Sequence, residues 1–444
     1  MQTRSGWVLG WLLVGMVFTL GFGAQITLAD VGGLQIRPYL PFLIAAAVVI
    51  GVRARRRGFL PLPPAAASLP ALGFLLLAGL LSIFNAEYAA QAVKQTVFLL
   101  GMIGVYLVLL FAELTERDLR RITQAILWSL AAAVGFGFFH FVREYAQSGS
   151  VVVGFVHFRS FFEERNEFGL FMVYAAGFLL PLALNDDQPV RYKVLLAFTV
   201  MALLLNFSRG SLLAFGAMLV VDRLGAGRLF ARRRARRSLI ALGAIAVVAT
   251  AAVMVLLPGL AGMTEFLDVL TTRSLGFRVT TDETTSVRLL FIMTATRAFL
   301  AHPLIGNGIG NVGYVLNQYG RGADFGTVTL RGAVQPPAYD LGTTSNIFAD
   351  LLLETGLLGL LSFLAFVAAG LRASLDRSGT GNATGLLQSG ALLSFIGVLI
   401  NGFSYNSLYL PFTWVAFALA PLVAASRKPR ETTAPQGAPA PIVS

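Results

Sequence analysis

Two motifs decide how this chain folds: Ala301-His-Pro-Leu-Ile-Gly-Asn-Gly-Ile-Gly310 and Thr344-Ser-Asn-Ile-Phe-Ala-Asp-Leu-Leu-Leu-Glu-Thr-Gly-Leu-Leu-Gly359. Both lie in a stretch from Ser286 to Gly359, and no apolar run long enough to cross a bilayer occurs between Pro258 and about Glu354. A loop this long is usually functional or disordered. Helical periodicity at 289–300 and the glycine-rich turn of the first motif predict a folded loop, presented by a membrane scaffold.

The composition indicates an integral membrane protein. Of 444 residues, 56% are apolar and 13% are charged, whereas soluble domains carry roughly 25% charged residues. The chain has no cysteine and three histidines, which disfavours a metal site, and no cofactor is expected. The net charge of +12 does not predict nucleic-acid binding, because the basic residues cluster in short loops between apolar runs.

The expected fold is an all-α polytopic membrane protein with about twelve transmembrane helices of roughly 20 residues each. The expected spans lie near 7–28, 38–51, 68–84, 93–112, 120–142, 168–184, 191–206, 210–224, 238–257, 356–371, 386–405 and 408–425. Nine helices would fill 1–257, a partly helical periplasmic loop with the active-site motifs 258–355, and three helices 356–425. The Pro- and Ala-rich tail 426–444 is expected to be disordered and cytoplasmic.

The distribution of basic residues predicts the orientation in the membrane. Alternate loops on one side hold 22 of the 34 Lys and Arg residues, including Arg232–Arg237, against 6 in the short loops of the other side. Since basic loops stay inside, both termini should be cytoplasmic and the long loop periplasmic. Membrane lipids are expected partners, and the family resemblance described below implies the inner membrane of a bacterium.

Several charged residues on the outer side could carry chemistry. Arg209, in a tight turn between two apolar runs, could clamp a phosphate through its guanidinium or simply extend to the lipid headgroups. Arg288 and Arg297, nine residues apart, fall on different faces of one helix. The Glu163–Glu167 group could be catalytic or a hydrated helix start. His302 before Pro303 could cap a helix end.

Four features occur in a specific order along the chain: Phe207-Ser-Arg-Gly-Ser-Leu-Leu-Ala214, then Arg288, then Ala301–Asn311, then Ser345–Gly359. Together they resemble the O-antigen ligase/O-antigen polymerase family. The Arg159–Asn166 segment also resembles that family's entrance to its middle spans. The closest resemblance runs from about Phe158 to Phe366, and the N-terminal third matches only in hydropathy.

The resemblance implies a metal-independent glycosyltransferase of the outer leaflet. Such enzymes transfer a glycan from an undecaprenyl-diphosphate donor to a glycan or lipid acceptor. Arg209 and Arg288 match the arginines that hold the diphosphate. Substrate-binding candidates are Arg159, Arg165, Arg297, Ser345 and Asn346.

The chain departs from the family at Ser345, where the resemblance places a histidine before Asn346. A serine hydroxyl is no general base at neutral pH, although Ser345 could bind an acceptor hydroxyl or cap the helix that begins near Ile347. The substitute bases expected first are Glu163 and Glu164. The remaining candidates are Glu167, His157, Asp340 and Asp350. We therefore expect a polymerase-like or exopolysaccharide enzyme rather than a strict lipid A-core ligase.

Two other classes of protein compete with this interpretation. A transporter or flippase for a lipid-linked glycan would place ionisable residues at mid-membrane depth on broken helices. Here the spans hold almost no charge, which disfavours ion-coupled transport but not passive lipid handling. A structural membrane subunit would use the long loop only to bind a partner.

Overall fold

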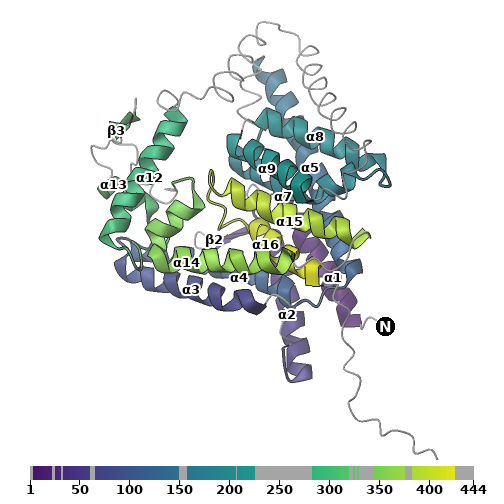
Figure 1. The fold of residues 1–444 in the computed structure, drawn as a ribbon, viewed down its shortest axis with the longest axis horizontal. Helices are drawn as coiled ribbons and strands as arrows, with labels where there is room; N and C mark the ends of the chain where they lie inside the picture. Colours follow the sequence, from purple (N-terminus) through teal and green to yellow (C-terminus); the bar gives the residue numbers. More distant parts are fainter. Residues whose placement is uncertain are drawn as a thin grey trace, which may run out of the picture.

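The computed structural model describes residues 4–22, 26–31, 34–60, 66–149, 158–206, 208–225, 283–319, 324–325, 328–329, 344–375 and 383–425. Within these ranges nearly all regular structure is helical (Figure 1). Two small antiparallel strand pairs, β1 (Ala29–Val31) with β2 (Leu34–Ile36) and β3 (Asp324–Phe325) with β4 (Val328–Thr329), correct the all-α expectation in detail only.

The helices follow the apolar runs of the sequence. They are α1 (Arg4–Thr19), α2 (Tyr39–Arg57), α3 (Leu69–Ser82), α4 (Ala89–Phe111), α5 (Glu116–Ser148), α7 (Arg165–Leu184), α8 (Val190–Asn206), α9 (Arg209–Gly225), α12 (Glu283–Ala301), α13 (Val312–Tyr319), α14 (Ile347–Leu375), α15 (Ala383–Asn401) and α16 (Pro411–Ala425). Short 3-10 turns lie at η1 (Leu20–Phe22), η2 (Ala66–Ser68) and η3 (Ile83–Asn85).

Eleven of the twelve expected spans coincide with a helix, and the twelfth, 238–257, lies outside the described residues. Within the described residues, five helices are long and apolar enough to cross a membrane: 66–85, 89–111, 116–148, 165–184 and 347–375. The last begins about nine residues before the expected 356, and α2 ends after the expected 51. A count of twelve spans stays a prediction. The described part of the long loop contains α12 and α13, and the topology expected for the loop stays a prediction.

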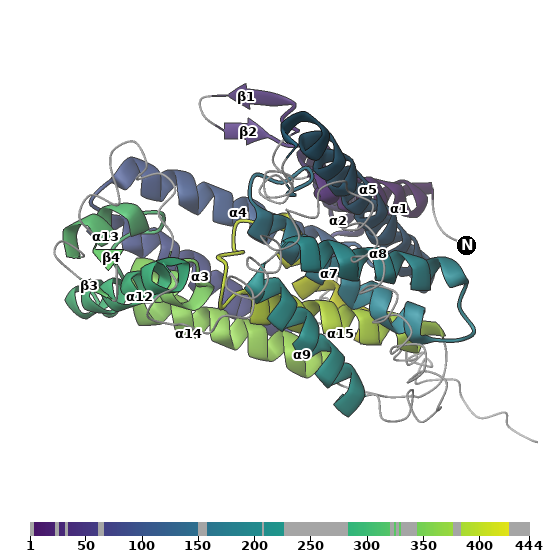
Figure 2. The same cartoon turned by 90° about the horizontal axis from the view of Figure 1, so that it is seen from above.

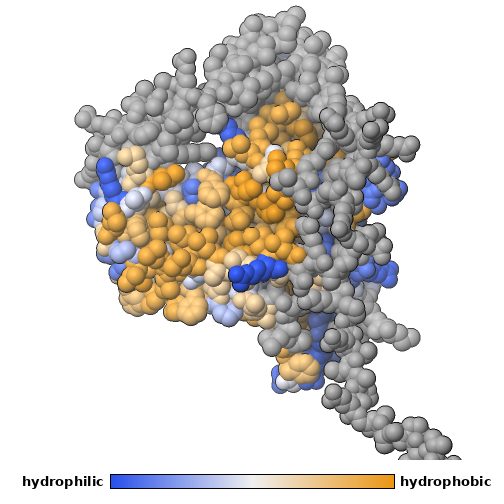
Figure 3. Space-filling model, viewed as in Figure 1, coloured by the Kyte–Doolittle hydropathy of each residue, from blue (hydrophilic) through white to orange (hydrophobic). Residues whose placement is uncertain are grey.

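The core of the molecule is built on α7 and α16. Almost every residue of α7 and nearly all of α16 are buried, so both helices are apolar all round, as interior helices are. The helix α15 packs against α7, and α14 packs against α3 and α16. Figures 1 and 2 show α12 and α13 beside the start of α14, on the side away from α1 and α2. The outer face of the helices forms a broad apolar surface (Figure 3), as expected against lipid.

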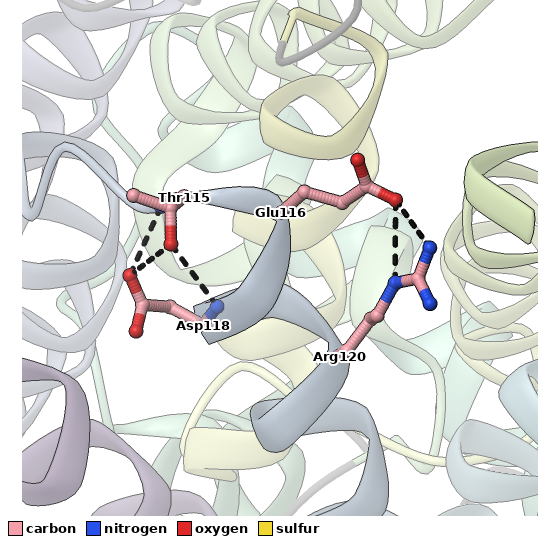
Figure 4. A network of polar contacts seen from close by, with 4 residues as sticks. All are labelled: Thr115, Glu116, Asp118 and Arg120. Atoms are coloured by element: carbon pink, nitrogen blue, oxygen red, sulfur yellow. Dashed lines mark hydrogen bonds and ion pairs between the residues drawn. The ribbon is translucent and has the colours of Figure 1, made fainter.

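One end of the helices is basic. The last turn of α2 carries Arg55–Arg57, and Arg57 forms an ion pair of 2.7 Å with Glu113 after α4. The helix α5 begins beside it with a capping box between Thr115 and Asp118 (Figure 4), which satisfies otherwise unpaired backbone N–H groups. The expected cytoplasmic basic clusters 53–57 and 117–121 therefore lie at the same end of the molecule.

Candidate functional site

At the opposite end, the turn between α8 and α9 carries Arg209 as the first residue of α9. The Ser208 hydroxyl donates to the Asn166 side chain over 3.1 Å, and the Asn206 amide donates to the Arg165 carbonyl over 3.0 Å. Both bonds fix the start of α9 against the start of α7. Arg209 is partly buried at this junction.

Glu167 links the acidic segment before α7 to the connection between α15 and α16. One carboxylate oxygen accepts the Glu163 backbone N–H (3.2 Å), and the other accepts the Tyr405 hydroxyl (3.2 Å). Glu167 is buried, whereas Glu163 and Glu164 are exposed. Arg159 donates to the Glu163 carbonyl over 2.9 Å. Of the three glutamates, Glu167 therefore organises the segment, and the other two face solvent.

The start of α14 is capped by Asn346. Its side-chain oxygen accepts the N–H groups of Phe348 (2.9 Å) and Ala349 (3.1 Å), and its amide donates to the Phe403 carbonyl (3.2 Å). The helix begins at Ile347 as expected, but the capping role expected of Ser345 is wrong. Ser345 instead has φ +58°, a left-handed turn residue ahead of the cap. Asparagine caps at least as well as serine, because its oxygen reaches the same backbone donors.

We expect Asn346→Ala to lower the free energy of unfolding by about 1 kcal/mol, because two helix N–H groups lose their acceptor. Ser345→Ala keeps the cap and is the matched control, with a smaller expected loss than Asn346→Ala. Denaturant titration of both purified variants measures the difference. Equal losses in the two variants would contradict the assignment of the cap.

Asp350 is a structural residue, since its carboxylate is fully buried and engaged on both oxygens. It accepts the Thr344 backbone N–H over 2.8 Å and the Asn406 amide over 2.6 Å. A base must reach the acceptor hydroxyl to take its proton. Asp350 is therefore a weaker candidate for the substitute base than the exposed Glu163 and Glu164.

The connection between α15 and α16, residues 402–410, joins these elements. None of its residues was predicted to have a role. Tyr405 reaches Glu167, and Asn406 reaches Asp350. Burial raises the pKa of Tyr405 far above its ordinary value, and the neighbouring Glu167 raises it further. Burial likewise raises the pKa of Tyr409, with Glu354 adding to it. Both phenols therefore stay protonated and can act as donors. A polar run between two apolar runs is the pattern that could have revealed this connection.

The glycine-rich motif 303–311 packs between α14 and the turn between α3 and α4 and does not form a phosphate loop. We call this segment the wedge. Its backbone donates to α14: Asn307 to the Leu353 carbonyl (2.9 Å) and Gly310 to the Glu354 carboxylate (2.8 Å). On its other side, Asn311 accepts the N–H of Tyr88 over 2.9 Å. The wedge thus holds α14 against the turn between α3 and α4. Its N–H groups at Asn307 and Gly310 are occupied and cannot cradle a phosphate.

The remaining sequence candidates lie on or near α12 or outside the described residues. Arg297 is exposed on α12, which packs against α13 and α14, whereas Arg209 begins α9 against α7 (Figures 1 and 2). Arg288 lies on the same helix as Arg297, with its side chain outside the described part. A shared site for Arg209 and Arg288 therefore stays a prediction. His157 and Asp340 lie outside the described residues. His302 is exposed, and its Nδ1 lies 3.4 Å from the Asn85 amide.

Four helices thus begin at one polar junction, α7, α9, α14 and α16, tied together by the connection 402–410. We call this end, with Arg159–Glu167, Ser208–Arg209, Thr344–Asn346 and 402–410, the polar junction. The described side chains include no group of three His, Cys, Asp or Glu that could hold a metal ion, and independence from metals stays a prediction.

A comparison with family models finds one match across residues 194–364, to the family described as O-antigen ligase. Over these residues the chain is similar to the O-antigen ligase family. The matched segment contains Arg209, Arg288 and Ser345–Asn346, which agrees with the resemblance seen in the sequence. It indicates glycan transfer of the O-antigen ligase or polymerase type at a membrane. No curated protein matches the chain.

The family segment and the polar junction overlap only in part. Arg159–Glu167 precedes the matched residues 194–364, and the connection 402–410 follows them. The O-antigen ligase segment supplies Arg209 and the start of α14, while the flanking segments supply the exposed carboxylates and the tyrosine that anchors them. The site is therefore assembled from three separate parts of the chain.

Proposed function

We propose that the protein is a membrane glycosyltransferase that moves a glycan from an undecaprenyl-diphosphate donor to a glycan or lipid acceptor at the polar junction. The observation that carries the proposal is that Arg209, the exposed Glu163 and Glu164, and Ser345–Asn346 stand on elements joined at one end of the helices. The family match over 194–364 supplies the reaction type.

The electrostatics of the junction suit a diphosphate. Helix N-termini carry a partial positive charge of roughly half an elementary charge and favour anions, and four helices start here. Arg209 adds a full, permanently protonated charge. Glu167 and Asp350 are buried and hydrogen-bonded within the protein, so only the exposed Glu163 and Glu164 offset part of this positive charge at the surface. The leaving diphosphate would therefore be stabilised as its negative charge develops.

The transfer step follows from this arrangement. An acceptor hydroxyl oxygen attacks the anomeric carbon of the donor glycan, and the new glycosidic C–O bond forms as the bond to the diphosphate oxygen breaks. The electron pair of that bond leaves with undecaprenyl diphosphate. The acceptor proton passes to an exposed carboxylate, Glu163 or Glu164. A positioned base of this kind contributes about 10²–10⁴-fold to the rate.

The decisive assay uses purified protein in proteoliposomes with a lipid-diphosphate-linked glycan on the outer leaflet. Glycosyltransfer predicts release of undecaprenyl diphosphate and a product of increased glycan length or a new acceptor linkage. A flippase would move the donor between leaflets without consuming it, and a structural subunit would do neither. Elongation of a second lipid-linked glycan would support the polymerase-like assignment over a lipid A-core ligase.

The exposed carboxylates give the second prediction. Replacement of the base by glutamine should lower the transfer rate about 10²-fold or more. Because the two glutamates are adjacent, the single variants Glu163→Gln and Glu164→Gln are compared with the double variant. Glu116→Gln, at the basic end, is the control and should keep its rate within about twofold. Wild-type turnover in the double variant would mean that neither residue acts as a base.

The third prediction concerns orientation, because the proposed donor is accessible only from the periplasm. The chain has no cysteine, so single cysteines report their side of the membrane. An impermeant maleimide should label Gln147→Cys, at the end of α5 near the polar junction, in intact spheroplasts. It should not label Asp187→Cys, between α7 and α8 at the basic end. The reverse labelling would invert the topology.

A further inference from the structure

A pocket at the basic end of the molecule holds an arginine whose donors lack an acceptor. The pocket lies between the end of α2 and the end of α4 and is lined by Arg53, Arg57, Glu113 and the apolar residues Ile50, Phe59, Leu60 and Phe111. Nε and Nη2 of Arg53 are shielded from water and have no hydrogen-bond partner in the described part of the chain. This pocket is remote from the polar junction.

An unpaired buried guanidinium is costly, because each donor loses its bond to water and gains nothing in return. The obvious acceptor is already taken: Glu113 binds Nη1 of Arg57 over 2.7 Å. Glu113 has φ +50°, an uncommon backbone conformation for a residue of this type. Arg57 is therefore paired within the chain, whereas Arg53 feels the charge of Glu113 nearby but has no hydrogen-bond acceptor for Nε and Nη2 in the described part.

The surroundings of Arg53 are those of a membrane-water interface. Along α2, the side chains of Ile44, Val48 and Val52 are exposed at a spacing of four residues, which places them in one apolar stripe on the helix surface. The stripe ends directly before Arg53. Beyond the helix, Gly58 adopts φ +76° and ends α2, and the next two side chains, Phe59 and Leu60, are 63% and 43% exposed.

We propose that this pocket binds the headgroup of an anionic phospholipid. The Arg53 guanidinium would receive the phosphate oxygens in a charge-assisted bond, while the acyl chains lie along the stripe of α2. Phe59 and Leu60 form the rim, and their exposed side chains give way as the phosphate enters. Arg55–Arg57 in the last turn also offset the negative end of the helix dipole. That role needs no pocket and leaves the Arg53 nitrogens unpaired.

The test is lipid titration of purified protein in a zwitterionic detergent, followed by thermal unfolding. Dioleoylphosphatidylglycerol should raise the melting temperature of the wild type, whereas dioleoylphosphatidylcholine and inorganic phosphate should not. Arg53→Gln should weaken the apparent affinity for phosphatidylglycerol about tenfold, the loss expected for one charge-assisted bond. Arg56→Gln removes the same charge three residues further along α2. Its apparent affinity for phosphatidylglycerol should stay within about twofold of the wild type.

A variant that binds phosphatidylglycerol more tightly than the wild type cannot owe its change to misfolding, so one such variant is included. Glu113→Gln removes the competing carboxylate and frees Arg57, so it should tighten phosphatidylglycerol binding several-fold. Glu116→Gln makes the same change of charge beside the pocket and should leave the affinity within about twofold. Equal effects in the two glutamate variants, or in the two arginine variants, would overturn the site in favour of diffuse electrostatics. Full stabilisation by inorganic phosphate would overturn the assignment to a lipid.

Discussion

Gly356→Ala is expected to destabilise the protein by about 3 kcal/mol or more. Both the backbone conformation of Gly356 and the lack of space around it exclude a side chain. Gly356 has φ +65° and ψ −160° within α14, a region that only glycine populates freely. A Cβ placed there would lie 2.5 Å from the carbonyl carbon and oxygen of Leu304. That backbone cannot retreat, because the Leu304 carbonyl accepts the N–H of Leu358 over 3.1 Å.

The measurement is thermal unfolding by fluorescence-detected size exclusion, with an expected fall in melting temperature of about 5 °C or more. Gly104→Ala is the control: Gly104 lies within α4 with nothing within 4 Å of an added Cβ. Alanine there should be neutral or stabilising by up to about 1 kcal/mol, since it favours helix over glycine. A Gly356→Ala protein as stable as Gly104→Ala would show that the wedge does not hold α14.

The apolar runs predicted most of the helices, because burial of long apolar segments leaves a chain few alternatives. They could not predict the break in α14. Residues 347–355 carry Asp350 and Glu354 among apolar side chains, and the expected span began only at 356. In the structure the first turns of α14 precede Gly356, held by the wedge 303–311. A long-range backbone contact decides that boundary, and hydropathy carries no information about it.

The sequence likewise indicated some residues of the candidate site and not others. Arg209, Glu163, Glu164 and Asn346 were found because charged or polar residues at the ends of apolar runs stand out. Whether a polar residue is exposed or buried depends on its partners in the fold. The hydrogen bonds that bury Asp350 and Glu167 could therefore not be predicted from the sequence. Tyr405 was missed because a tyrosine between apolar runs is typical of any membrane interface. Its hydrogen bond to Glu167 spans more than two hundred residues of sequence.

Arg209→Ala is expected to lower glycan transfer at least tenfold while leaving the amount of protein in the membrane unchanged. A hydrogen bond to a charged group contributes about 1.5–3 kcal/mol, and the developing charge on the leaving diphosphate is where that contribution is greatest. Arg209 is not fully buried, and the amount of protein in the membrane is measured beside the rate to separate folding from catalysis. The rate is measured with purified lipid-linked donor at saturating concentration.

Arg209→Lys separates charge from geometry. Lysine keeps the positive charge but cannot offer two parallel N–H groups to a phosphate, so it should restore only part of the rate. Arg191→Ala, on the exposed start of α8 at the basic end, removes an equal charge far from the polar junction and should keep full activity. Arg209 would be removed from the mechanism if Arg209→Ala matched Arg191→Ala in turnover. The proposed diphosphate site would then be sought at α12, where Arg288 and Arg297 lie nine residues apart on one helix.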